Sequence, residues 1–283
     1  MYFGAHFSIK GGFHIAAEKA REMGCTTLQI FTRSSRIWKS KPLDEKLVEK
    51  FRSAVNELKL HKPVVHLPYL PNFSTDDPAI YEKSHHSLRE EILRCDSLGI
   101  PYLVIHIGSH KGKGVENGIK NVISHLEKVQ EQLDKTGVKI CLETMAGTKN
   151  STGSRFEEIG KIIEGVNDNK QLGVCFDTAH VFAAGYDIRT PETVENTIEA
   201  FDDAIGLVRL NVIHCNDSKF DLNSGKDRHE HIGQGHIGKE GFRAFFTNKR
   251  VATLDVPVIL ETPIDERGNH ETDFKALREI VGF

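Results

Sequence analysis

Six apolar runs of the sequence each end on one histidine or carboxylate side chain. The six residues are His66, His106, Glu143, Asp177, His214 and Glu261. If the runs are parallel strands of one sheet, their carboxyl ends lie at one edge and the six side chains converge. Converging carboxylates repel one another and raise one another's pKa, and divalent ions relieve that conflict. A mixed set of His, Asp and Glu therefore predicts a metal site for zinc, with iron (Fe2+), manganese (Mn2+) or cobalt (Co2+) as substitutes.

Three further residues extend this set of candidate ligands. His180 follows Asp177 by three residues, and Asp227 and His229 form an Asp-x-His pair that an extended segment can place on one face. Taken one at a time, such residues are also typical of a hydrogen-bonded core histidine or an ion pair, and only the combination favours metal. The five cysteines show no C-x-x-C spacing, which argues against a thiolate zinc site and for a reducing, cytoplasmic compartment.

The chain alternates eight times between a short apolar run and a segment with helical periodicity. The expected strands are 2–8, 26–31, 63–67, 102–108, 139–144, 172–178, 210–216 and 256–262. The expected helices are 12–24, 43–60, 78–98, 116–135, 155–166, 191–207, 239–248 and 271–280. The alternation predicts an α/β fold, a single (β/α)8 TIM barrel over residues 1–283 with its active site at the carboxyl ends of the strands. A doubly wound open sheet is the alternative, disfavoured because no G-x-G-x-x-G motif follows the first run.

Length and composition limit the remaining classes of protein. A chain of 283 residues can bury a large core without disulfides. No apolar stretch is long enough to span a membrane, and the first ten residues are typical of a strand, not of a signal peptide. The formal net charge of −3 by itself argues against nucleic-acid binding. Nothing in the sequence indicates an obligate protein partner.

The candidate ligands stand within longer motifs that resemble those of the endonuclease IV family of apurinic/apyrimidinic (AP) endonucleases. The resemblance covers nearly the whole chain, and the two longest motifs are specific. The motifs are Gly4-Ala5-His6-Phe7-Ser8, Phe31-Thr32-Arg33-Ser34-Ser35-Arg36-Ile37-Trp38, His66-Leu67-Pro68-Tyr69, His106-Ile107-Gly108-Ser109-His110, Leu142-Glu143-Thr144-Met145-Ala146-Gly147, Asp177-Thr178-Ala179-His180-Val181-Phe182-Ala183-Ala184-Gly185-Tyr186-Asp187, His214-Cys215-Asn216-Asp217-Ser218-Lys219, Asp227-Arg228-His229-Glu230-His231-Ile232-Gly233 and Leu260-Glu261-Thr262.

The resemblance implies three zinc ions per chain. By motif, the first ion would take His66, His106 and Glu143. The second would share Glu143 and take Asp177, His214 and Glu261. The third would take His180, Asp227 and His229. The additional histidines His231 and His236 leave open which imidazole binds the third ion.

The resemblance also implies a reaction and a partner: hydrolysis of the phosphodiester 5′ to an abasic site in double-stranded DNA, leaving a 3′-hydroxyl and a 5′-deoxyribose phosphate, in base excision repair. Glu261 and Glu143 would be the catalytic carboxylates, with Glu261 orienting or activating the nucleophile. Three Zn2+ ions add +6 to the net charge of −3, which answers the charge objection.

Loops around the site supply candidate DNA contacts. Arg33, Arg36, Trp38 and Lys39 form a basic and aromatic cluster that is equally typical of a solvated loop with one packed Trp. The resemblance makes Arg36 and Tyr69 candidates to enter the base stack. The glycine-rich segment 108–114 could contact phosphate or be a plain loop. His6 is expected near the site, hydrogen-bonded to a ligand and not itself a ligand.

Two other classes of protein compete with the nuclease. A sugar isomerase or epimerase would share the fold and the strand-end ligands, but it needs only one or two ions. A non-enzymatic module that binds DNA lesions would have an incomplete ligand set, usually at Glu143 or Glu261, and here both are present.

Overall fold

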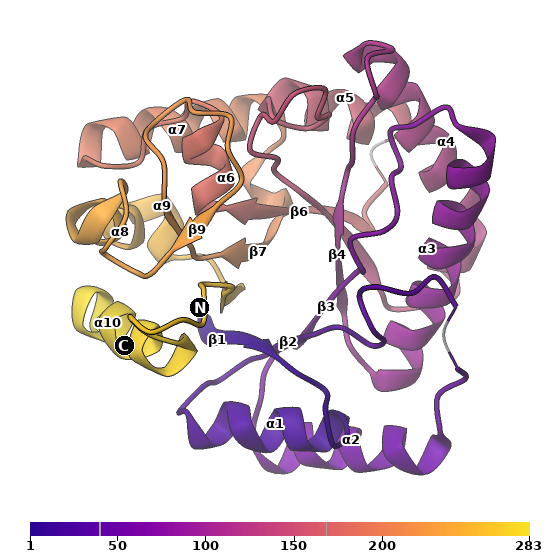
Figure 1. Cartoon of the computed structure of the whole chain (residues 1–283), viewed down its shortest axis with the longest axis horizontal. Coiled ribbons are helices and arrows are strands. Elements are labelled where there is room, and N and C mark those ends of the chain that lie inside the picture. The colour runs from indigo at the N-terminus through magenta and orange to yellow at the C-terminus, as the bar shows by residue number, and fades with distance from the viewer. Residues whose placement is uncertain (40, 168) are drawn as a thin grey trace.

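The computed structural model describes residues 1–39, 41–167 and 169–283. Parallel strands close into a barrel in the order β1-β10-β7-β6-β5-β4-β3-β2 (Figure 1). The strands are β1 (Tyr2–Phe7), β2 (Gln29–Ile30), β3 (Val64–His66), β4 (Tyr102–His106), β5 (Lys139–Glu143), β6 (Leu172–Asp177), β7 (Leu210–His214) and β10 (Pro257–Leu260). The predicted (β/α)8 TIM barrel is confirmed, and the doubly wound alternative is wrong because the sheet has no open edge.

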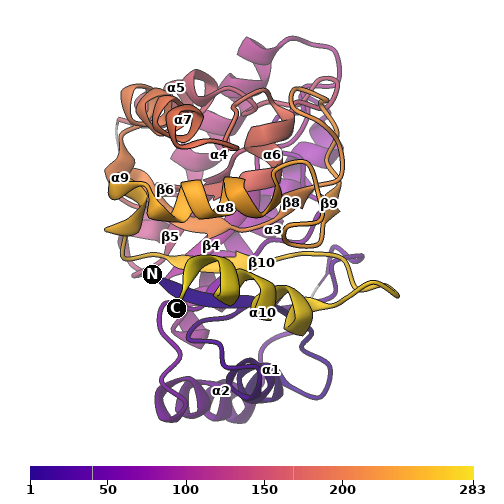
Figure 2. The same ribbon diagram turned by 90° about the vertical axis from the view of Figure 1, so that its left-hand side faces the viewer.

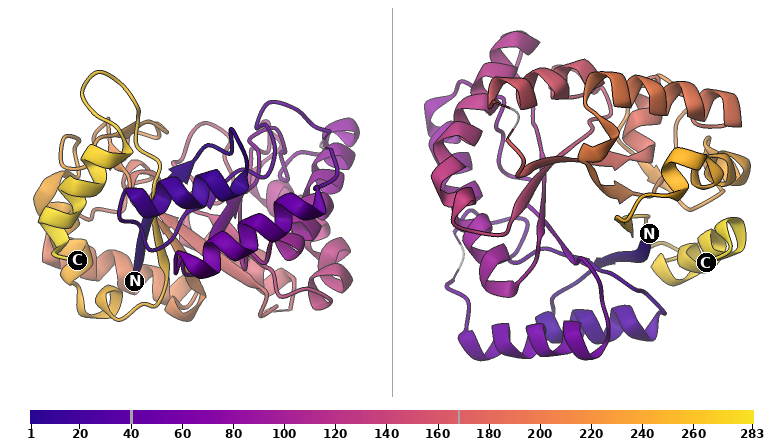
Figure 3. Two further views of the ribbon diagram at one scale, coloured as in Figure 1. Left: turned by 90° about the horizontal axis from the view of Figure 1, so that it is seen from below. Right: turned by 180° about the vertical axis from the view of Figure 1, so that it is seen from behind.

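Helices follow the strands and surround the barrel, as the right-hand view of Figure 3 shows. They are α1 (Phe13–Glu22), α2 (Glu45–Glu57), α3 (Pro78–Leu98), α4 (Val115–Asp134), α5 (Phe156–Gly165), α7 (Pro191–Ala204), α8 (Gly238–Thr247) and α10 (His270–Val281). Helix α3 has the predicted bounds because its ends are strongly marked. The Asp77 carboxylate accepts the backbone N–H groups of Ala79 and Ile80, and Gly99 ends the helix at φ 69°.

Some elements were not predicted from the sequence. They are α6 (Thr178–Ala183), a 3-10 turn (Leu207–Arg209), α9 (Lys249–Ala252), and an antiparallel pair formed by β8 (Asp217–Ser218) and β9 (His229–Glu230). Figure 2 shows β8 and β9 beside α6, at one end of the barrel. The pair matters for function because β9 carries His229 to the same end as the strand-end residues.

The interior of the barrel is filled by a small layer of buried side chains below the candidate ligands. The layer consists of Val64, Val104, Cys141, Cys175, Val212 and Ile259. Each of these residues precedes one of the six strand-end ligand candidates by two positions. Because side chains on a strand alternate between its faces, both members of each pair point into the barrel. The apolar layer therefore forms the floor on which the polar site stands.

The two ends of the chain lie close together on the outside of the barrel. Figure 1 shows the N and C labels close to each other. Helix α10 returns the chain to β1, where the rings of Phe3 and Phe283 stack with centroids 3.7 Å apart. In the described part of the chain, no helix combines the length and apolar character that crossing a bilayer requires.

Candidate metal centre

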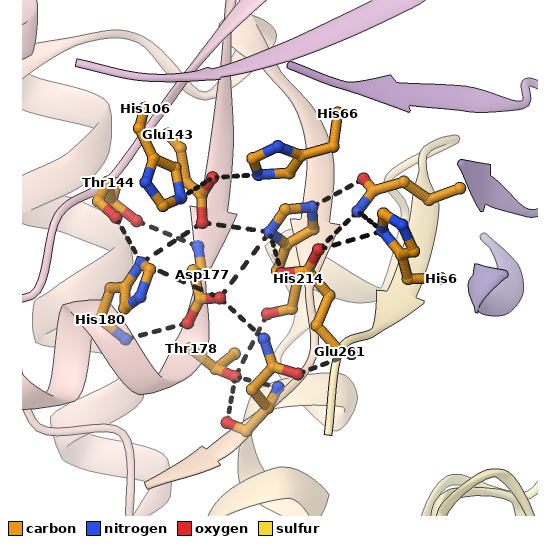
Figure 4. Close-up of polar contacts among 12 residues, drawn as sticks. His6, His66, His106, Glu143, Thr144, Asp177, Thr178, His180, His214 and Glu261 are labelled. Carbon is orange, nitrogen blue, oxygen red and sulfur yellow. Dashed lines mark hydrogen bonds and ion pairs between the residues drawn. The ribbon is translucent and has the colours of Figure 1, made fainter. Parts of the chain in front are cut away.

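Glu143, at the end of β5, lies at the middle of the candidate site with its side chain fully buried (Figure 4). Its Oε2 atom is 3.1 Å from Nε2 of His66 and 3.1 Å from Nε2 of His106. Its Oε1 atom is 3.2 Å from Nδ1 of His214 and 3.3 Å from Nδ1 of His180. The two oxygens of one carboxylate thus face different histidines, which is the arrangement that a carboxylate bridging two ions requires.

Glu261 and Asp177 complete the deep part of the site around His214. The His214 Nδ1 atom is 3.2 Å from Oε2 of Glu261 and 3.7 Å from Oδ2 of Asp177. His66, Glu143, His214 and Glu261 offer ligand atoms that all lie within 4.8 Å of one another, close enough to share one ion.

A second group lies beside the first and combines β6, α6 and the β8–β9 pair. Asp177, His180 and His229 offer ligand atoms within 4.8 Å of one another. Asp227 joins them, with its Oδ1 3.1 Å from Nε2 of His180 and 3.9 Å from Nε2 of His229. All nine residues predicted as ligands therefore lie in one connected cluster.

Hydrogen bonds to backbone carbonyls fix which nitrogen of three imidazoles faces the cluster. Nδ1 of His66 lies 2.7 Å from the carbonyl oxygen of Leu67. Nδ1 of His180 lies 2.9 Å from the carbonyl oxygen of Thr144, and Nδ1 of His229 lies 3.1 Å from the carbonyl oxygen of Glu261. Since a carbonyl oxygen only accepts, each Nδ1 carries the hydrogen. In a neutral ring of this form, the lone pair of Nε2 faces carboxylate oxygens. Nitrogen and oxygen are then both acceptors, and they repel each other unless a cation lies between them.

One orphaned nitrogen supports the fit to a metal. In the part of the chain that the structure describes, the buried Nε2 atom of His229 forms no hydrogen bond, and Oδ2 of Asp177 lies 3.6 Å from it. Buried polar atoms normally have partners, so this nitrogen calls for one of a different kind. Neutral imidazole and carboxylate, without thiolate, are the donor set of a catalytic zinc site.

Electrostatics within the cluster keep the carboxylates ionised. Burial would raise the pKa of Glu143, but positive charge on His106 and His214 outweighs it and holds that pKa well below its usual range. Burial would likewise lower the pKa of His214, but the negative charges of Glu261 and Glu143 raise it to about 9. The pocket thus attracts positive charge, and a dication that binds there displaces protons from the imidazoles.

The residues predicted to contact DNA differ in exposure. Tyr69 is 56% exposed and stands over the cluster, its ring centroid 5.4 Å from that of His66 and 5.3 Å from that of His106. Arg36 is exposed, and Trp38 is half-buried with the Lys83 ammonium 5.9 Å from its ring centroid. These three residues are open to a ligand.

Arg33 is a correction to the prediction, because its guanidinium is buried and engaged within the protein. It pairs with Glu90 and Glu91 of α3, each at 3.1 Å, and also contacts the Ser87 hydroxyl. Its side chain is only 3% exposed, so it anchors the loop and does not offer its charge to DNA.

Neither additional histidine of the loop after β7, His231 or His236, joins the cluster. His231 is buried and uses both ring nitrogens, Nδ1 at 2.8 Å from Asp273 and Nε2 at 3.0 Å from Asp265. His236 is exposed, with its Nδ1 3.8 Å from Oδ1 of Asp221. His229 is therefore the imidazole of this loop that lies with Asp177 and His180.

Two buried amides that contact the candidate ligands were not predicted from the sequence. Asn216 donates to Oδ2 of Asp177 at 2.7 Å and accepts the backbone N–H of Glu261 at 2.8 Å. Gln29 contacts His6, His214 and Glu261. The one available signal was a glutamine between Leu28 and Ile30 in the expected strand 26–31. His6 was expected beside the ligands, and it lies there with its Nδ1 3.5 Å from Oε1 of Glu261.

Comparison with known proteins agrees with this geometry. Residues 17–280 match the xylose isomerase-like TIM barrel family. The chain is 46% identical to the probable endonuclease 4 of Methanoculleus marisnigri, over 99% of this chain and 98% of that protein. The structure is similar to that of endonuclease IV from Thermus thermophilus, with a TM-score of 0.85, 32% identity and coverage of 100% and 99% of the two chains. The chain belongs to the endonuclease IV family.

Membership of the endonuclease IV family makes the chain a nuclease of the hydrolase class, as its motifs predicted. A D-tagatose 3-epimerase-like protein is also similar in structure, with a TM-score of 0.76, but at 21% identity this likeness shows the fold alone. The endonuclease IV family therefore shares its barrel with sugar epimerases, and the distinction between them lies in the site.

Proposed function

We propose that this chain is a zinc-dependent AP endonuclease that acts in base excision repair in the cytoplasm. It hydrolyses the phosphodiester 5′ to an abasic site in duplex DNA and leaves a 3′-hydroxyl and a 5′-deoxyribose phosphate. The observation that carries the proposal is the cluster of nine His, Asp and Glu side chains, which is larger than one or two ions need.

Three ions are proposed, each with the ligands that the family motifs assign. His66, His106 and Glu143 would hold the first, and Glu143, Asp177, His214 and Glu261 the second. His180, Asp227 and His229 would hold the third. When bound, the ions supply an acidified water as nucleophile and neutralise charge on the scissile phosphate and the departing oxygen.

The open side of the cluster supports a role for Glu261 at the reacting atoms. The side chains of Glu143, Asp177 and His214 are wholly buried, whereas Glu261 is 11% and Asp227 40% exposed. Glu261 is therefore the deep carboxylate that a bound phosphodiester can reach. We assign it the role of orienting the attacking water and taking its proton, and we assign Glu143 the role of holding the ligands in place.

Tyr69, Arg36 and Trp38 are the proposed DNA contacts at the rim. Burial and the nearby carboxylates raise the pKa of Tyr69, so its phenol is neutral at physiological pH. A neutral ring can stack on bases. An abasic nucleotide stacks poorly and costs less to extrude than an intact one, which gives the enzyme a source of selectivity.

Metal analysis combined with a nicking assay tests the proposal. We expect about three zinc ions per chain and cleavage of an abasic duplex on its 5′ side, abolished by a chelator and restored by added zinc. The matching undamaged duplex is the control for specificity. One or two ions per chain with no nicking would overturn the proposal and favour a sugar epimerase.

A further inference from the structure

Gln29 connects the candidate metal centre to the two barrel strands that contribute none of its nine candidate ligands. It lies on β2, is fully buried, and is flanked by His6 of β1. Its Nε2 atom is 2.6 Å from Oε1 of Glu261 and 3.0 Å from Nδ1 of His6. Its Oε1 atom is 2.9 Å from Nε2 of His214. One amide therefore contacts two candidate ligands that come from different strands.

The chemistry of the neighbours determines which way the amide points. Nε2 of Gln29 donates to Oε1 of Glu261 at 2.6 Å, since a carboxylate oxygen without a hydrogen only accepts. The carbonyl oxygen of Gln29 then faces His214, and an oxygen that only accepts requires a hydrogen on Nε2 of His214. The second hydrogen of the NH2 points at His6, whose Nδ1 accepts it.

This orientation determines which atoms of the two ligands remain for a cation. With its hydrogen on Nε2, neutral His214 presents the lone pair of Nδ1, the nitrogen 3.2 Å from both Glu143 and Glu261. With Oε1 occupied by Gln29, Glu261 presents Oε2, the oxygen nearest that nitrogen. Both free atoms face the same point in the cluster.

We propose that Gln29 is a positioning residue that holds His214 in its Nε2–H tautomer and turns Oε2 of Glu261 toward the ion these two residues share. The inference rests on the proposed function, because that ion is the second of the three assigned above. Gln29 acts through the two ligands and does not itself touch the ion or the substrate.

Two substitutions separate the two contacts of the amide. Gln29→Met keeps the length of the side chain and removes every hydrogen bond. Gln29→Glu keeps an acceptor for His214 but places a carboxylate against Oε1 of Glu261. The matched control is Gln171→Met, since Gln171 lies just before β6 at the opposite end of the barrel and donates to the Leu133 and Thr136 carbonyls.

Zinc affinity, measured by competition with a chelator, is the first measurement. Loss of a hydrogen bond that supports a metal ligand typically weakens metal affinity about 10- to 100-fold. We expect that loss for one ion of three in both Gln29 variants and wild-type affinity for all ions in Gln171→Met. The proposal is overturned if Gln29→Met binds every ion with unchanged affinity. If Gln29→Met does not fold, the same result in Gln29→Glu overturns it.

Nitrogen-15 NMR of the histidines in the zinc-loaded protein is the second measurement. We expect a slowly exchanging Nε2–H signal from His214 in the wild type, in Gln29→Glu and in Gln171→Met, and its loss in Gln29→Met. Persistence of the signal in Gln29→Met contradicts the role in the tautomer. If the wild type holds three ions and nicks abasic DNA, and Gln29→Met has the same zinc affinity and the same Nε2–H signal, this inference is refuted and the proposed function stands. A wild type that does neither would refute the function itself.

Discussion

The ring of Tyr69 adjoins both the candidate ligands and the solvent through which DNA would arrive. The Tyr69 ring packs against Phe31, with the two ring centroids 5.5 Å apart, and against His66 and His106. More than half of the residue's surface remains exposed. A ring that is held in place on one side and open on the other loses little conformational entropy when a base stacks on it.

Replacing Tyr69 should therefore reduce selectivity without affecting the metal. Stacking of a base on an aromatic side chain is worth about 1–3 kcal/mol. We expect Tyr69→Ala to lower the preference for abasic over intact duplex about 5- to 150-fold, with zinc content unchanged because the ring supplies no ligand. Competition binding with the two duplexes, alongside metal analysis, measures this. Tyr69→Phe is the control that keeps the ring, and equal discrimination by the wild type and Tyr69→Ala would contradict the role.

At the scale of the elements, the positions of the strand-end candidate ligands were predictable because they depend on local sequence alone. A buried strand has a period of two, so an apolar residue followed two positions later by His, Asp or Glu already places both inside the barrel. The pair Val212 and His214 is one example. The same rule cannot identify Gln29, whose partner Glu261 is 232 residues away.

Contacts between distant elements also explain the remaining differences from prediction. Arg33 stands in a basic loop, but Glu90 and Glu91 of α3 neutralise and bury it. The sequence around Arg33 does not indicate that these two glutamates lie beside it. Helix α6 begins inside what appeared to be the end of a strand. Asp177 both ends β6 and accepts the backbone N–H of His180 at 2.9 Å, which starts the helix. The β8–β9 pair is too short for a pattern to mark it.

Helices α3 and α4 enclose a buried histidine that should make the stability of the fold sensitive to acid. His125 of α4 stacks on Tyr81 at 3.9 Å between ring centroids and lies beside Phe73 and His85. Neither ring nitrogen has a hydrogen-bond partner among the described residues. Burial, with the added charges of His85 and Lys128, lowers the pKa of His125 to about 3.

The direction of the effect follows from that lowered pKa. Below pH 6.5 the unfolded chain binds a proton at this histidine that the folded chain refuses, so the free energy of unfolding falls as pH falls from 6.5 toward 3. The slope approaches about 1.4 kcal/mol per pH unit for one proton. Metal-free wild type and His125→Leu are unfolded by urea between about pH 7 and pH 4, and the wild type should lose stability relative to the variant on acidification. A constant difference across this range would contradict the prediction.

At the scale of the whole molecule, the candidate metal centre joins elements from most of the chain. Its ligand candidates come from the ends of five strands, the residue directly after β10, helix α6 and the β8–β9 segment, spanning His66 to Glu261. Cations bound there would cross-link the barrel at one end, while the apolar layer fills the interior beneath. Without them, buried carboxylates depend on protonated histidines for neutralisation, which ties the stability of the whole barrel to metal occupancy.

Removing metal should consequently destabilise the entire fold and not one loop. A ligand present at about 100 times its Kd stabilises a protein by about 2.7 kcal/mol, and for chains of this order each kcal/mol moves the melting temperature by about 2–4 °C. We expect a chelator to lower the midpoint of thermal unfolding by at least about 5 °C in a single transition, and zinc to restore it. In the His180→Ala control, which lacks one proposed ligand of the third ion, the shift should shrink but persist because the other two ions remain. An identical midpoint for wild type with and without chelator would mean that the nine side chains neutralise one another as ion pairs, and that the barrel does not require metal to keep them together.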